Sequence, residues 1–128
     1  MKPDDQRPSG GDPDGARLSA AGDVVIVLCT TSEAQAGSLA DALLAAGLVA
    51  CVNLVGPVES RYLWEGRAEV SREMLSVMKT TRARLAELTA AIVAAHEYEL
   101  PEILVLPVDS GLEGYLGWVA RSCGGATG

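Results

Sequence analysis

The sequence predicts an α+β fold, a ferredoxin-like β-α-β-β-α-β sandwich with a long β-ribbon and a short C-terminal helix. Three observations support this prediction. Short apolar runs rich in β-branched residues alternate with segments of helical periodicity. Two long extended segments adjoin a glycine-containing turn between them. The chain has 128 residues, the size of one domain, and 48% of them are hydrophobic, enough to bury a core.

The first 22 residues are predicted to be a disordered tail, because they hold three of the six prolines and little apolar surface. The folded domain is expected over residues 23–123. The last residues, 124–128, are expected to be disordered as well.

A central strand is predicted where the run VVIVLCTT begins at Val24. Ser32 then has the character of an N-cap, and Gln35 completes a capping box. Apolar residues at helical spacing follow, and Gly47 is a suitable residue to end the helix.

A second strand, VACVNLV, is expected to be broken or bent by Gly56-Pro57. The segment 58–81 is predicted to be a long two-stranded ribbon that turns near Glu65-Gly66-Arg67. A second helix is expected over 82–95, a core strand over 103–106, and a final short helix that carries Tyr115 and Trp118. In this arrangement both helices cover one face of the sheet. Apolar residues alternate on both faces of the strands, so we expect other copies of the chain to cover the open face.

Charge and composition exclude several classes of function. The net charge is −7 and the isoelectric point is about 4.6, which argues against nucleic-acid binding. No apolar run approaches the roughly 20 residues of a membrane span, and the first residues lack the apolar stretch of a secretory signal. The three cysteines are too few for a disulfide scaffold. The sequence therefore predicts a cytoplasmic protein without a membrane partner.

The side chains that could act in catalysis or metal binding gather around His96, the only histidine. Glu97, Tyr98, Glu99 and Glu102 lie within the same seven residues, at a helix end where side chains can reach a groove. An exposed polar loop explains the same pattern. Cys29 is either a small buried hydrophobe or a ligand at the end of its strand. If folding joined a cysteine, a histidine and carboxylates, the donors would suit copper or zinc.

Three further side chains also bear on function. Lys79 could neutralise a carboxylate, for which Glu73 lies on the same strand face, or it could bind an anion. It could instead discourage edge-to-edge aggregation. Tyr62 and Trp64 lie on one side of the ribbon and are typical anchors of an interface or a core.

Five ordered motifs resemble those of the CutA divalent-cation tolerance proteins, over Val24 to about Ser122. They are Ala50-Cys51-Val52-Asn53, Tyr62-x-Trp64-x-Gly66, Lys79-Thr80-Thr81, His96-x-Tyr98-x-x-Pro101-Glu102 and Tyr115-x-x-Trp118. The resemblance implies a homotrimer in which ribbons pair with neighbouring subunits. It also implies that Tyr62, Trp64, Lys79, Tyr98, Tyr115 and Trp118 line an inter-subunit cleft or interface.

The resemblance further implies a non-enzymatic protein that binds a divalent metal, copper in particular, and that needs no cofactor to fold. The expected metal ligands are Cys29 and His96, with Glu102 and Glu97 adding charge. Two departures from the family pattern affect this site. Ala95 stands where some members carry a second histidine, and Glu97 replaces a proline. The alternative is a trimer similar to the PII signalling proteins, with a small molecule or partner in its cleft; an enzyme that uses His96 and Lys79 is a third possibility.

Overall fold

The computed structural model describes residues 16–124. Its elements are, in chain order, β1 (Leu18–Ala20), β2 (Val24–Thr31), α1 (Glu33–Ala45), β3 (Cys51–Trp64), β4 (Arg67–Thr81), η1 (Arg82–Arg84), α2 (Leu85–Ala95), β5 (Ile103–Pro107), β6 (Ser110–Leu112) and α3 (Glu113–Gly124). The predicted α+β class and the predicted β-α-β-β-α-β order are confirmed, the latter as β2-α1-β3-β4-α2-β5. No helix of the described residues is long and apolar enough to cross a membrane.

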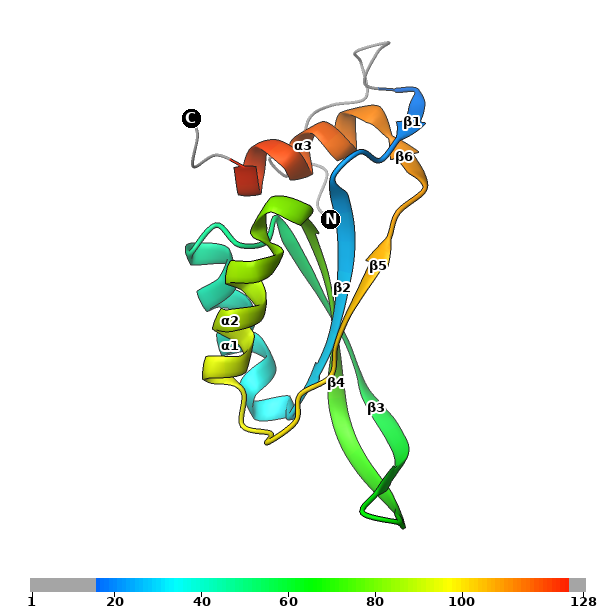
Figure 1. The fold of residues 1–128 in the computed structure, drawn as a ribbon, viewed down its shortest axis with the longest axis vertical. Helices are drawn as coiled ribbons and strands as arrows, with labels where there is room; N and C mark the ends of the chain where they lie inside the picture. Colours follow the sequence, from blue (N-terminus) through cyan, green and yellow to red (C-terminus); the bar gives the residue numbers. More distant parts are fainter. Residues whose placement is uncertain (1–15, 125–128) are drawn as a thin grey trace.

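A four-stranded antiparallel sheet of order β3-β4-β2-β5 forms the centre of the molecule. Helices α1 and α2 lie on one side of it, and β3 and β4 extend well beyond the helices as a two-stranded ribbon (Figure 1). The ribbon turns at Glu65 and Gly66, both with positive φ, which is the geometry of a two-residue hairpin turn. The predicted ribbon and its turn are therefore confirmed.

Local sequence signals set the ends of α1. The Ser32 side chain accepts a hydrogen bond from the Gln35 backbone N–H, so the predicted N-cap is confirmed. The Gln35 side chain does not complete a capping box, because it donates to the Ala95 carbonyl at the end of α2. Gly47, with φ +71°, follows the helix as predicted.

Two apolar clusters hold the layers together. The larger one lies between the sheet and the helices, and it includes Val27, Met78, Leu43, Leu88 and Ile92. The smaller one packs α3 against the start of β2. Its buried members are Ala21, Val24, Leu116, Val119 and Cys123.

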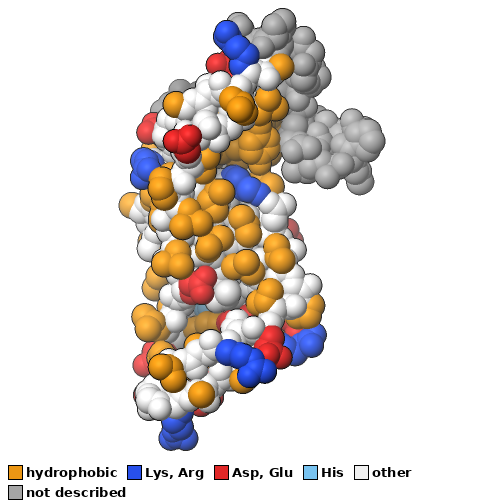
Figure 2. Space-filling view, turned by 90° about the vertical axis from the view of Figure 1, so that its right-hand side faces the viewer, with side chains coloured by type: hydrophobic (Ala, Val, Ile, Leu, Met, Phe, Trp, Pro, Cys, Tyr) orange, Lys and Arg blue, Asp and Glu red, His pale blue; other side chains and the backbone are white. Residues whose placement is uncertain are grey.

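The face of the sheet opposite the helices is uncovered and apolar. The strand register places Leu104, Leu28 and Val77 side by side across it. Leu104 is 53% exposed. Figure 2 shows hydrophobic side chains gathered over the middle of this face, flanked by a few charged ones. This exposed apolar surface is consistent with the expectation that other copies cover it.

The N-terminal boundary of the domain differs from the prediction. Residues 18–20 form β1, which pairs with β6, and Ala21 is buried in the smaller cluster. Structure therefore begins before Asp23, and the segment 16–22 is not a disordered tail. Helix α3 extends to Gly124, one residue past the predicted end. Residues 1–15 and 125–128, also predicted to be disordered, lie outside the described residues.

Candidate functional site: an acidic, aromatic pocket beside the ribbon

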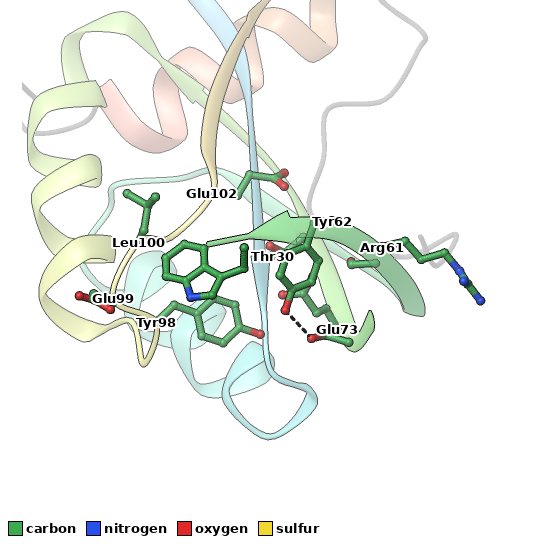
Figure 3. Close-up of a pocket in the computed structure, with 11 residues that line it drawn as sticks. Thr30, Arg61, Tyr62, Glu73, Tyr98, Glu99, Leu100 and Glu102 are labelled. Carbon is green, nitrogen blue, oxygen red and sulfur yellow. Dashed lines mark hydrogen bonds between the residues drawn. The ribbon is translucent and has the colours of Figure 1, made fainter. Parts of the chain in front are cut away.

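A pocket of about 620 Å³ lies between the ribbon and the loop after α2. The ribbon contributes Tyr62 and Trp64 from β3 and Glu73 from β4, and the loop contributes Tyr98, Glu99, Leu100 and Glu102. Thr30, Ser60, Arg61 and Ser71 complete the lining. The side chains of Tyr62, Tyr98 and Glu73 approach one another in Figure 3. The volume of the pocket is within the usual range for small-molecule sites, about 300–1,000 Å³.

The His96 ring joins the loop to the end of β2. Its Nε2 lies 2.7 Å from the Thr30 carbonyl oxygen, and its Nδ1 accepts a hydrogen bond from the Tyr98 N–H at 3.0 Å. Because Nδ1 accepts, Nε2 carries the hydrogen and donates to Thr30, which defines a neutral tautomer. His96 is only 9% exposed, and its ring packs against that of Tyr98 in a tilted arrangement with 4.5 Å between centroids. His96 thus has both ring nitrogens occupied by backbone groups.

The Cys29 thiol faces the helices and not the pocket. It belongs to the larger core cluster and has no exposed surface. Burial, followed by the charges of Glu102 and Glu73, raises the pKa of Cys29 from its usual 9.0 to about 11. The neutral thiol is therefore the stable form near neutral pH, whereas a metal ligand must be the thiolate.

The four predicted metal ligands do not form one group. The Glu97 carboxylate accepts a hydrogen bond from the Ser32 hydroxyl at the start of α1, while Glu102 lines the pocket. Across residues 16–124, no three His, Cys, Asp or Glu side chains are placed to hold one metal ion. The set of Cys29, His96, Glu97 and Glu102 therefore does not assemble within the described part of one chain. The physical reason is that the thiol is in the core and the imidazole is committed to the backbone.

The residues predicted to line a cleft or interface separate into three places. Tyr62, Trp64 and Tyr98 meet in the pocket. Lys79 lies on the open sheet face, where its ammonium group donates to the Asn53 side chain and not to Glu73. Tyr115 and Trp118 pack against the smaller cluster, with ring centroids 5.6 Å apart.

Sequence reasoning missed the place of Glu73 in the pocket. Strand alternation puts Glu73 on the same face of β4 as Lys79, as predicted, but Glu73 is nearly buried in the pocket and accepts a hydrogen bond from the Tyr98 hydroxyl. Burial and this hydrogen bond raise the pKa of Tyr98. No local signal identifies the pair, because it depends on how the loop after α2 meets the ribbon.

Comparison with known proteins places this fold in a family. The model of the CutA1 divalent ion tolerance protein family matches residues 24–122. The chain belongs to this family. The predicted resemblance is thereby confirmed over the range of residues from which it was drawn.

Individual relatives agree with this assignment. The divalent-cation tolerance protein CutA of Escherichia coli is 41% identical over 99 residues, which cover 77% of this chain and 88% of that protein. The chloroplastic protein CutA of Arabidopsis thaliana is 38% identical over 99 residues, 77% of this chain. The chain spans only about half of the length of the plant relatives, 54% and 56%.

Solved structures share the fold. CutA of Synechococcus elongatus superposes with a TM-score of 0.81 at 35% identity, covering 86% of this chain and 98% of that one. A protein of Nostoc described as a PII-like CutA superposes with a TM-score of 0.74 at 32% identity, covering 77% and 96%.

Proposed function

We propose that this CutA-family chain is a non-enzymatic divalent-cation tolerance protein that binds its ion as a homotrimer with a ferredoxin-like core. The observation that carries the proposal is the acidic pocket at the base of the ribbon, close to an uncovered apolar sheet face. Glu73, Glu99 and Glu102 line the pocket, and carboxylates are favourable ligands for divalent cations.

The sheet supports the assembly. A monomer would leave the row of Leu104, Leu28 and Val77 and the long ribbon in contact with water. Exposed apolar patches of this kind usually mark interfaces. Three copies related by a closed rotation would cover each face with a neighbouring ribbon.

The donor set favours an ion held by oxygen. Each chain provides separated carboxylates, so a complete coordination shell needs donors from a second copy or from solvent. Copper was the expected ion. Oxygen donors suit Cu(II) and Zn(II) better than Cu(I), for which the buried thiol of Cys29 and the occupied ring of His96 are poorly placed. Folding without metal is also expected, because apolar packing forms the core.

Titration calorimetry with Cu(II) and Zn(II) tests this function. We expect the Glu102→Gln variant to bind either ion at least about tenfold more weakly than the wild type, since it loses a charged ligand. Glu59→Gln is the matched control, because it removes the same charge from an exposed ribbon position outside the pocket. Equal affinities for the wild type and Glu102→Gln, or a scattering mass of one protomer, would contradict the proposal.

A second candidate function is a signalling trimer that binds a small molecule or partner in the same pocket. The aromatic lining favours it, because rings are the usual contacts of an organic ligand. Metal titrations without any uptake by the wild type would leave this candidate as the better one.

We also propose a cytoplasmic location, supported by the three free cysteines Cys29, Cys51 and Cys123. Fractionation of cells that produce the full chain would test it, and recovery from an oxidising compartment would contradict it.

A further inference from the structure

Within the part of the chain that the structure describes, the Glu73 carboxylate is a buried acidic group without a cationic partner. Glu73 is 7% exposed and lines the pocket, and its hydrogen bond comes from the uncharged Tyr98 hydroxyl. Among residues 16–124, no Lys or Arg forms an ion pair with it. A buried carboxylate is normally paired, because removing it from water is costly. A cation that entered the pocket would supply the missing partner.

Arg61, which contributes to the pocket lining, is not that partner. It directs its head group away from Glu73 and Tyr98 (Figure 3). It pairs instead with Glu59, at 2.6 Å on the exposed ribbon. The side chains that remain around the cavity give it a negative potential, and the net charge of −7 strengthens that potential at long range.

The walls of the pocket are aromatic. Tyr62 and Trp64 are two residues apart on β3, so their side chains lie on the same face of the ribbon. In the single chain they are 43% and 42% exposed, and Tyr98 faces them from the loop. Aromatic faces attract ammonium groups and accept the methylene groups beside them. A hydrated inorganic ion would gain nothing from these rings.

The carboxylates are spread around the cavity. Glu73 comes from β4, whereas Glu99 and Glu102 come from the loop, and the three lie on different sides in Figure 3. Within the described part of the chain, they do not converge as ligands of one metal ion. Separated negative charges complement a ligand whose positive charges are also separated, with apolar spacers between them.

We propose that this pocket binds an aliphatic polyamine. One ammonium group pairs with Glu73, a second pairs with Glu102 or Glu99, and the methylene chain packs on Tyr62, Trp64 and Tyr98. This site goes beyond the binding of a divalent ion, and it gives the second candidate function a ligand class.

Calorimetry with spermidine at constant ionic strength tests the site in the full-length assembly. We expect the wild type to bind spermidine more tightly than putrescine, and putrescine more tightly than n-butylamine, because each added ammonium group reaches another carboxylate. Glu73→Gln should weaken spermidine binding by about tenfold or more, the effect of losing a charge-assisted hydrogen bond. Glu59→Gln, the matched control, should change it by less than about twofold.

Two further variants keep the test decisive if Glu73→Gln fails to fold. Glu102 is exposed, so Glu102→Gln is expected to fold and to weaken spermidine binding. Trp64→Leu should weaken it by about threefold to tenfold, and Trp64→Phe should restore part of the loss. Light scattering on each variant checks the assembly, and only variants with the wild-type mass are compared.

The outcomes separate this site from metal binding. Trp64→Leu removes a ring but no oxygen donor, so it should weaken spermidine binding more than Cu(II) or Zn(II) binding, and this difference supports the polyamine site. Three results would show that the interaction is only general electrostatics and would overturn the proposal. They are equal affinities for the three amines, an equal effect of Glu59→Gln and Glu73→Gln, and displacement of spermidine by MgCl₂ at the same ionic strength. No uptake of spermidine would overturn it too, even if metal binding were confirmed.

Discussion

Replacing His96 by alanine should destabilise the protein whether or not metal is present. The ring makes two hydrogen bonds in a nearly closed environment, at 2.7 Å to the Thr30 carbonyl and at 3.0 Å from the Tyr98 N–H. Each such bond contributes about 0.5–1.5 kcal/mol, and buried groups left without partners add a desolvation cost of about 1–3 kcal/mol. Water that enters the vacated space would recover part of this loss. We therefore expect the free energy of unfolding to fall by about 2–3 kcal/mol.

Urea unfolding followed by circular dichroism measures this change. Wild type and His96→Ala are compared at one protomer concentration, because assembly makes stability depend on concentration. All samples contain EDTA, so that no metal ligand effect contributes. Glu97→Gln is the control, since it changes the adjacent exposed residue and should cost less than about 0.5 kcal/mol.

The competing role of His96 gives a different result. A histidine that acts only as a metal ligand would leave the stability in EDTA unchanged and would matter only after metal is added. A loss below about 0.5 kcal/mol in EDTA, together with a large loss in Cu(II) or Zn(II), would refute a structural role for the ring.

Three other predictions concern different parts of the fold. The pKa of Cys29 is about 11 in the folded state against 9.0 ordinarily, so the folded state holds this proton more tightly. This difference in pKa contributes up to about 3 kcal/mol to the free energy of unfolding below pH 9, and the contribution is lost as the pH rises through 11. Denaturant titrations over pH 8–11 should therefore show that the free energy of unfolding depends less on pH in Cys29→Ala than in the wild type. Gly56→Ala should lower the free energy of unfolding by about 1–3 kcal/mol in the same assay, because φ is +148° and the added Cβ would lie 2.9 Å from a backbone nitrogen. The control Gly37→Ala, which adds its methyl group in open space on α1, should stabilise the protein. Deleting residues 1–22 should lower the melting temperature by about 4 °C or more, because β1 and the buried Ala21 are lost. An unchanged melting temperature would instead support the prediction of a disordered tail over residues 1–22.

Local chemistry was sufficient to predict most of the elements. Ser32 caps α1 because a hydroxyl can accept from a backbone N–H three residues later. Gly47 ends that helix and Gly66 turns the ribbon because glycine accepts positive φ without a steric cost. In each case the partner is close in the chain, so the sequence pattern contains the whole signal.

The strands β1 and β6 lacked such a signal. Each has three residues, and Leu18 pairs with Leu112 across most of the chain. Strands this short have no periodicity to detect, and their pairing depends on α3 closing over the end of the sheet. The sequence therefore predicts an N-terminal boundary, Asp23, that lies several residues after the first strand of the structure.

The residue types that gather after α2 can be read from the sequence alone, and they include the only histidine and several carboxylates. The alternation of side chains along the strands can be read from it too, but alternation does not say which face meets the helices. The folded chain is needed to place Cys29 in the core and to bring His96 to Thr30, 66 residues away. It is also needed to bring Glu73 to Tyr98. These contacts depend on packing between distant segments, and packing is set by the whole fold and not by neighbours in the chain.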